Sequence, residues 1–155
     1  MMDMRRLDRA VDREEAQSYL REATVGYLAL AENNIPYAIP LHFVWHEQSI
    51  YFHCAPEGRK ITILRQNPQC TFAVSFLDGI KSGGSACEYG TYYRSAIVEG
   101  VARFVSDAEE KLMALTALTE KHAQVPFSPV TAAGMAKTTV IAIDIVNISG
   151  KARRS

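Results

Sequence analysis

Cysteine is scarce in this 155-residue sequence, and the few cysteines do not form an obvious pattern. Cys54, Cys70 and Cys87 are odd in number and widely spaced, and no CxxC pair occurs. A disulfide framework needs paired cysteines, and a structural zinc site needs closely spaced ligands. The pattern therefore indicates reduced thiols and favours the cytoplasm as the location.

An excess of charge of one sign is also lacking, because 17 lysines and arginines balance 17 aspartates and glutamates. The basic residues near the ends (Arg5, Arg6, Arg9 and the tail 151–154) form small clusters typical of solvated termini. We therefore expect no nucleic-acid binding. The start, Met-Met-Asp-Met-Arg-Arg, has no hydrophobic signal region, and no apolar run approaches a membrane span, so we expect no membrane association.

One domain is the default at this length, which is enough to bury a sound core, and we expect a single domain over residues 1–155. Apolar periodicity and turn signals predict six strands and three helices. The strands are predicted at 25–31, 35–45, 49–54, 69–77, 94–105 and 138–148, the last buried on both faces. The helices are predicted at 12–23, at 58–67 and from Ser106-Asp107 onward, with an apolar stripe of Ala108, Leu112, Leu115 and Leu118.

The order of these elements determines the fold class. The strands follow one another through short turns, such as Glu32-Asn33-Asn34, and do not alternate with helices as in a βαβ protein. Residues 78–90 indicate a flexible loop, and 124–136 an irregular connection. We predict a mainly β protein with α: a small, six-stranded, mostly antiparallel β-barrel with flanking helices.

The segment around Gly58, Arg59 and Lys60 carries the most informative local signal. A β-patterned run at 50–54 leads into a helix whose first turn contains two cations. Cations oppose the positive amino end of a helix unless an anion lies there, held by free backbone N–H groups and the two side chains together. Arginine and lysine are the usual ligands of a phosphate group. A solvated basic surface is the alternative.

The strand predicted at 35–45 carries two prolines of the same parity, Pro36 and Pro40. Its odd positions are all apolar and define the core face. Both prolines remove N–H donors from one side of the strand, which is tolerated only where that side is unpaired, bulged or open. An open edge leaves backbone groups free to bind a flat polar molecule, whereas an ordinary exposed edge strand is the alternative.

Three blocks, at 36–43, at 50–60 with Asn67-Pro68, and at 93–100, resemble the FMN-binding split-barrel proteins. Met4-Arg5-Arg6 before the first helix is similar too. The likeness is greatest to the nitroimidazole-resistance (Nim) branch of the pyridoxamine 5'-phosphate oxidase-like superfamily, and it spans nearly the whole chain. It implies a homodimer of split barrels with two FMN molecules at the subunit interface.

The resemblance also implies which residues bind the cofactor. Arg59 and Lys60 would grip the FMN phosphate. The flavin-facing strand maps onto Pro40, Leu41, His42 and Phe43, with His42 where the oxidases carry a basic residue. His53 falls beside the cofactor, and Arg94-Ser95 matches an Arg-Gln pair, so that Ser95 would hydrogen-bond the flavin ring.

The histidines differ in what they can do. His42 and His46 lie about 13 Å apart on an extended strand at roughly 3.3 Å per residue, so they cannot share a metal ion, and we predict no metal site. His53 is the candidate catalytic residue, because an imidazole can donate or accept a proton while a bound substrate is reduced. His122 ends a helix, where we expect it to be a favourable C-terminal cation.

The sequence lacks the C-terminal Trp- and Arg-containing segment of the true oxidases, so we do not expect oxidation of pyridoxamine phosphate. We predict a cytoplasmic, homodimeric FMN-dependent oxidoreductase that reduces small organic molecules; a nitroaromatic or quinone-like acceptor follows from the resemblance. One alternative is a haem-binding split barrel with His42 or His53 as an axial ligand. Another is a flavin-binding protein without turnover.

Overall fold

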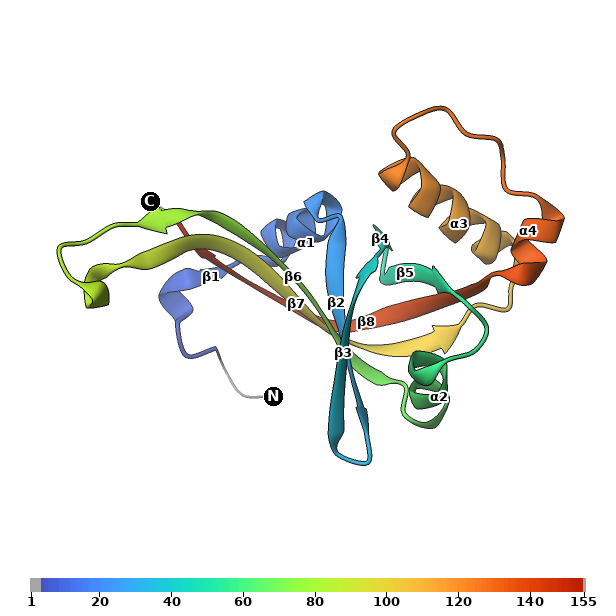
Figure 1. The fold of residues 1–155 in the computed structure, drawn as a ribbon, viewed down its shortest axis with the longest axis horizontal. Coiled ribbons are helices and arrows are strands. Elements are labelled where there is room, and N and C mark those ends of the chain that lie inside the picture. The colour runs from blue at the N-terminus through green and yellow to red at the C-terminus, as the bar shows by residue number, and fades with distance from the viewer. Residues whose placement is uncertain (1–3, 155) are drawn as a thin grey trace.

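The computed structural model describes residues 4–154, and eight strands of this part form one sheet. Its order is β3-β2-β6-β7-β8-β5-β4, with β1 paired to β8, and every pairing is antiparallel (Figure 1). The expectations for Met1 to Asp3 and for Ser155 lie outside the described residues. The strands are β1 (Ala10–Val11), β2 (Val25–Glu32), β3 (Ile35–His42), β4 (Val44–His46), β5 (Ser49–Cys54), β6 (Gln69–Lys81), β7 (Gly90–Phe104) and β8 (Thr139–Arg153).

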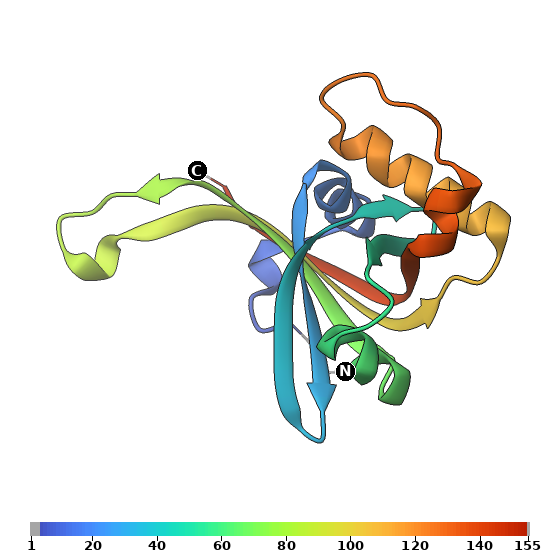
Figure 2. The ribbon, with the colours of Figure 1, turned by 45° about the vertical axis from the view of Figure 1, so that its right-hand side comes forward.

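The antiparallel, mainly β class is confirmed, but the prediction of six strands in a barrel was wrong in number and in closure. β1 has two residues, too few to show a period, and the predicted strand 35–45 is divided at Phe43 into β3 and β4. These two strands lie at opposite ends of the sheet order, so the chain crosses from one edge to the other through Phe43 alone. The sheet therefore curls strongly while its hydrogen-bonded path stays open (Figure 2).

The edge position that the prolines predicted for the strand at 35–42 is confirmed. β3 ends the sheet order and pairs with β2, so its other side is open in the described part of the chain. Pro36 lies opposite Ala31 and Pro40 opposite Tyr27. The predicted turn joins β2 and β3 with positive φ angles at Asn33 (50°) and Asn34 (64°), as a two-residue type I′ hairpin requires.

β6 and β7 run further than predicted and extend away from α2 and α3 (Figure 1). β8 pairs with β7 as far as Tyr93, so only residues 79–81 and 90–92 form a two-stranded tip. Lys81 pairs with Gly90, so the loop expected at 78–90 shrinks to residues 82–89. A short 3-10 helix, η2 (Ala86–Glu88), occupies part of it. The Glu88 carboxylate accepts hydrogen bonds from the Gly84 and Ser85 amides, which gives a Gly- and Ser-rich segment a defined conformation.

The helices begin where their capping residues predict. Asp12 caps α1 and Asp107 caps α3, and each aspartate accepts a hydrogen bond from an amide three residues later. The helices are η1 (Leu7–Arg9), α1 (Arg13–Glu22), α2 (Arg59–Gln66), α3 (Ala108–His122) and α4 (Ala132–Lys137). The short α4 begins inside the segment predicted to be irregular, after the two prolines of that segment. No helix among residues 4–154 is long and apolar enough to cross a membrane.

Two apolar clusters form the core. The larger one joins α1, α2 and the sheet around Phe43, Phe52 and Phe72, all fully buried. The smaller one lies under α3 and includes Leu115 and Leu118. Several core predictions were wrong. Ala108 and Leu112 of the predicted α3 stripe are exposed, the latter by 42%, whereas Ala114 is buried. Ile35, on the predicted core face of β3, is 58% exposed, and Val146 is 70% exposed, because β8 is fully buried only over 140–143.

A charged network fixes α3 on the sheet. Glu110 of α3 accepts two hydrogen bonds from the Arg103 guanidinium, at 2.6 and 2.9 Å, and one from the Tyr51 hydroxyl at 2.8 Å. Arg103 also donates to Asp144 of β8 at 2.7 Å. The hydrogen bonds from Arg103 hold the pKa of the Glu110 carboxyl below its usual range. α3 therefore has a defined position, which matters because its last turn lines the candidate site.

Candidate functional site

The amino end of α2 combines positive charge with backbone N–H groups that no side chain caps. Gly58, the N-cap residue, has φ 121°, a conformation that favours glycine, and it provides no side-chain cap. The first turn holds no acidic residue. The first amides of a helix have no partner within the helix, so they can bind an external acceptor here.

Arg59 and Lys60 lie over aromatic rings at this end of α2. The Arg59 guanidinium is 4.4 Å from the centre of the Tyr37 ring on β3, and the Lys60 ammonium is 5.3 Å from that of Phe52 on β5. Arg59 is exposed and Lys60 half-buried. These contacts place the Arg59 cation beside β3 and the Lys60 cation beside β5, whereas the sequence predicted only their positions in the helix.

A hollow of about 380 Å³ lies where β3, β5 and the last turn of α3 meet. It brings together three residues that the sequence assigned to the cofactor site, Leu41, His42 and His53, with His122, which the sequence predicted only as a cation at a helix end. The remaining lining is Leu118, Thr119 and Ala123. Imidazoles and apolar groups dominate this surface, and no carboxylate is among the lining residues.

His122 and His42 are stacked, with ring centroids 4.8 Å apart and planes 13° from parallel. The His122 Nε2 atom is 3.0 Å from the Phe43 carbonyl oxygen. A carbonyl only accepts, so this nitrogen carries the proton. The signal for His122 was present in the sequence: Leu115, Leu118 and His122 follow the three- and four-residue spacing of one helix face.

Lys121, the preceding residue, adds a second contact to Phe43. Its ammonium is 4.0 Å from the centre of the Phe43 ring and donates a hydrogen bond to the Leu20 carbonyl at 3.2 Å. The side chain is half-buried, and burial lowers its pKa to about 8. Lys121 and His122, in the last turn of α3, thus both contact Phe43, the residue that links the edge strands β3 and β4.

The other residues predicted to bind the cofactor, Pro40, Phe43, Arg94 and Ser95, do not line the histidine hollow. Pro40 is exposed on the open edge, whereas the Phe43 side chain is fully buried and packs edge-on against Phe72 at 4.7 Å. Arg94 on β7 binds the carboxylates of Glu22 and Asp78. Ser95 is half-buried, opposite Ser75 in the register. This chain alone does not bring Arg94 and Ser95 into the histidine hollow.

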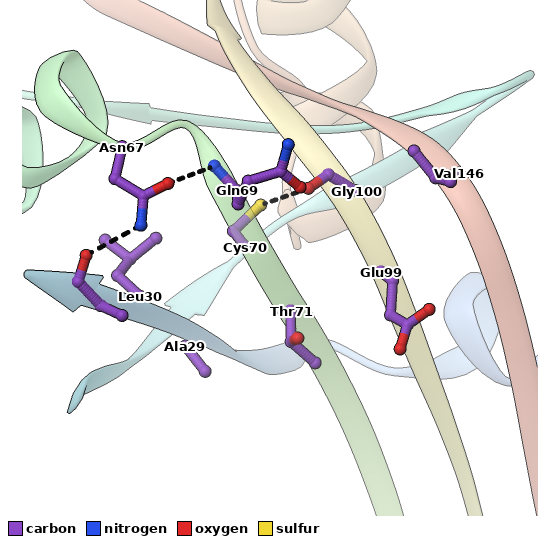
Figure 3. A pocket seen from close by; sticks show the side chains of 10 residues that line it. Ala29, Leu30, Asn67, Gln69, Cys70, Thr71, Glu99, Gly100 and Val146 are labelled. Atoms are coloured by element: carbon purple, nitrogen blue, oxygen red, sulfur yellow. Dashed lines mark hydrogen bonds between the residues drawn. The ribbon is translucent and has the colours of Figure 1, made fainter. Parts of the chain in front are cut away.

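A second hollow of about 500 Å³ is lined by residues of β2, β6, β7 and β8 together with Asn67 (Figure 3). Its lining includes Ala29, Thr71 and Glu99, which lie opposite one another on neighbouring strands, and the exposed Val146. Asn67 borders it and donates a hydrogen bond to the Ala31 carbonyl at 3.1 Å (Figure 3). In residues 4–154, no group of three or more His, Cys, Asp or Glu side chains is placed to hold a metal ion.

Solved structures show the same fold. A candidate 5-nitroimidazole antibiotic resistance protein from Bacteroides thetaiotaomicron is 25% identical with a TM-score of 0.79, over 92% of this chain and 85% of its own. The FAD and heme binding protein from Mycobacterium smegmatis is 25% identical with a TM-score of 0.80, over 93% and 72%. The flavocytochrome Anf3 from Azotobacter vinelandii reaches a TM-score of 0.85 at 24% identity, over 99% and 73%.

Sequence comparison agrees with the structural likeness. No curated protein resembles the chain closely enough to count as a match. A sequence profile of the pyridoxamine 5'-phosphate oxidase family, however, matches residues 12–152. The match covers β2 to α4 and nearly all of β8, and so includes every residue of the α2 end and of the histidine hollow. The chain therefore belongs to the pyridoxamine 5'-phosphate oxidase family.

Proposed function

We propose that the protein binds FMN and acts as a homodimeric oxidoreductase that reduces small organic molecules. The observation that carries this proposal is the uncapped amino end of α2, where Arg59 and Lys60 lie beside free helix amides. A phosphate group fits this end in charge and in hydrogen-bonding capacity. Gly58 leaves open space there, because a Cβ at its position would meet nothing within 4 Å.

The spacing of the two features suits an elongated ligand. Tyr37, which lies under Arg59, and His42, in the histidine hollow, are separated by five residues of β3, or about 16 Å at 3.3 Å per residue. A phosphate at α2 and a flat ring near the hollow would lie along this open strand edge. When bound, the flavin supplies the redox chemistry, and the protein contributes binding, orientation and polar contacts.

His53 is the residue that we assign to proton transfer. It is exposed at the end of β5, lines the hollow, and is separated from Lys60 by only the loop and the start of α2. An imidazole in this position can donate or accept a proton at the substrate. The hollow, with its N–H groups and apolar walls, fits a small flat acceptor that carries oxygens, such as a nitroaromatic or a quinone.

The homodimer is supported by the outer face of the sheet. The paired register places Pro40, Tyr27, Ala73 and Ile97 side by side across four strands. Tyr27 is 52% exposed, Ile97 46% and Val146 70%. Exposed apolar side chains gathered on neighbouring strands mark an interaction surface. We assign it to a second copy of the chain, so the interface includes the β3 edge and the β7 strand that carries Arg94 and Ser95.

The test is a comparison of cofactors. We expect the purified protein to bind FMN tightly and to prefer it to riboflavin, because riboflavin lacks the phosphate. Titration of flavin fluorescence measures both affinities under the same conditions. Equal affinity for riboflavin would remove the phosphate site from the proposal. Consumption of reduced nicotinamide with candidate acceptors then separates an enzyme from a flavin-binding protein without turnover.

Haem binding is the second candidate function. Two of the similar structures are named as a flavocytochrome and as an FAD and heme binding protein. The three histidines of the hollow offer imidazole ligands, of which His42 and His53 are exposed. An absorption spectrum of the purified protein decides between the two functions. A bound flavin gives broad absorption bands in the blue and near-ultraviolet, whereas a bound haem gives an intense Soret band.

A further inference from the structure

Two successive side chains in the last turn of α3 contact Phe43, the residue between β3 and β4. Lys121 packs on the Phe43 ring and donates to the Leu20 carbonyl, while His122 donates to the Phe43 carbonyl. α3 is itself fixed by the Arg103, Glu110 and Tyr51 network. The His122 ring therefore has a defined position even though the side chain lies at a helix end.

His42 has no comparable anchor of its own. It is exposed at the end of β3, an edge strand, and in the part of the chain that the structure describes its ring contact is the stack on His122. A free histidine side chain at such a place samples several rotamers. Near-parallel stacking, with ring centroids 4.8 Å apart, favours the observed position of the His42 ring at the hollow.

We propose that His122 is a positioning residue of the ligand site, which holds the His42 imidazole toward the hollow. The inference rests on the proposed function for the identity of the ligand, but the positioning itself needs no ligand. The His122 ring lines the hollow, but its Nε2–H donates to the Phe43 carbonyl and is not available to a ligand there. Its effect on ligand binding is therefore exerted through His42.

The first test reads the His42 ring without flavin. A stacked ring shifts the NMR signals of its neighbour, so the His42 ring protons in the wild-type protein report the stack. We expect His122→Ala to move these signals to those of an unstacked histidine. His122→Phe, which keeps a flat ring, should retain most of the shift, and the matched control His46→Ala, at an exposed histidine outside the hollow, should leave it unchanged.

The second test is a double-mutant cycle on FMN affinity. A hydrogen-bonding contact is worth roughly 0.5–1.5 kcal/mol, so we expect His42→Ala and His122→Ala each to weaken FMN binding about 2- to 12-fold. The double variant should bind within about twofold of His42→Ala alone, because His122 has nothing left to position. His46→Ala should bind FMN like the wild type.

Several results would overturn the assignment. Additive losses in the double variant would mean that His122 contacts the ligand itself, and unchanged His42 signals in His122→Ala would mean that the stack does not position the ring. A Soret band that appears on haem addition and is lost in His122→Phe would make His122 an iron ligand instead. If His122→Ala does not fold, both tests are made with His122→Phe and His122→Asn.

If the wild type binds no FMN, the proposed function fails, while the NMR comparison still decides the role of His122.

Discussion

Arg94 donates two hydrogen bonds to the carboxylate of Glu22, at 2.6 and 3.1 Å, and so ties β7 to the end of α1. The same guanidinium binds Asp78 at 2.9 and 3.0 Å and lies 4.3 Å from the centre of the Phe76 ring. These hydrogen bonds lower the pKa of both carboxyl groups. Arg94 therefore has a structural role in the single chain, while its contact with a flavin stays a prediction.

Replacement of Arg94 should make the protein less stable in a pH-dependent manner. Both carboxyl groups have lowered pKa values, so their pairing stabilises the fold above the ordinary carboxyl pKa and is lost as pH falls through the folded-state values. The groups are largely solvated, so we expect Arg94→Gln to lower the melting temperature by only a few degrees at pH 7. Melting curves at pH 7 and pH 3 measure this, and an equal deficit at both pH values would contradict it.

The outer sheet face gives a second prediction. Ile97 is 46% exposed on β7, and Leu112 is 42% exposed on α3. If the face around Ile97 is the dimer interface, Ile97→Asp buries an unpaired charge twice, which costs roughly 3–5 kcal/mol for each uncompensated charge. We expect dimer dissociation to become at least about 100-fold easier, whereas Leu112→Asp should leave it unchanged.

Light scattering at micromolar concentration, with FMN bound, measures the assembly of both variants. An FMN-loaded wild-type monomer would contradict the homodimer itself. Equal effects of Ile97→Asp and Leu112→Asp would instead place the interface elsewhere.

The half-buried Lys121 predicts how stability depends on alkaline pH. Burial lowers its pKa from the ordinary 10.5 to about 8, so between these values the unfolded chain binds more protons than the folded one. The contribution of Lys121 to stability therefore rises with pH from about 8 to 10.5. Urea unfolding measures the free energy of unfolding of the wild type and of Lys121→Met across this range. The wild type should gain stability relative to Lys121→Met as pH rises. A constant difference would mean that the ammonium is well solvated.

The sequence predicted most of the local structure, because local rules decide it. The Asp12 and Asp107 caps, the Asn33-Asn34 turn and the proline-marked edge strand each follow from neighbouring residues. The break at Phe43 could not be predicted in this way. A fully buried phenylalanine continues the apolar period of β3, and only the curl of the sheet moves the chain to the opposite edge there.

The sequence predicted those parts of the candidate site that depend on neighbouring residues. Arg59 and Lys60 lie in one helix turn, so their proximity is visible in the chain. The stack of His42 on His122 joins an edge strand to a helix far away in the sequence, and its geometry depends on the contacts that hold α3. Arg94 and Ser95 were assigned by resemblance to a dimeric site, which a single chain does not complete.

The cations of α2 give the prediction in which the physical argument and the family membership meet. Charge-assisted hydrogen bonds contribute roughly 1.5–3 kcal/mol, so Arg59→Ala or Lys60→Ala should weaken FMN binding about 10- to 150-fold. Lys60 should matter at least as much as Arg59, because it lies one residue further into the helix and is the less exposed of the two. Fluorescence titration with FMN measures each loss.

Arg65→Ala is the matched control, because Arg65 lies in the last turn of the same helix and packs over Phe104. It should leave FMN affinity unchanged. The stability of the flavin-free protein should change little in Arg59→Ala and Lys60→Ala, or even rise, since two cations at a helix amino end are unfavourable without an anion. FMN affinities that stay at the wild-type value in both variants would return this pair to a solvated basic surface, and the phosphate would have to be bound elsewhere.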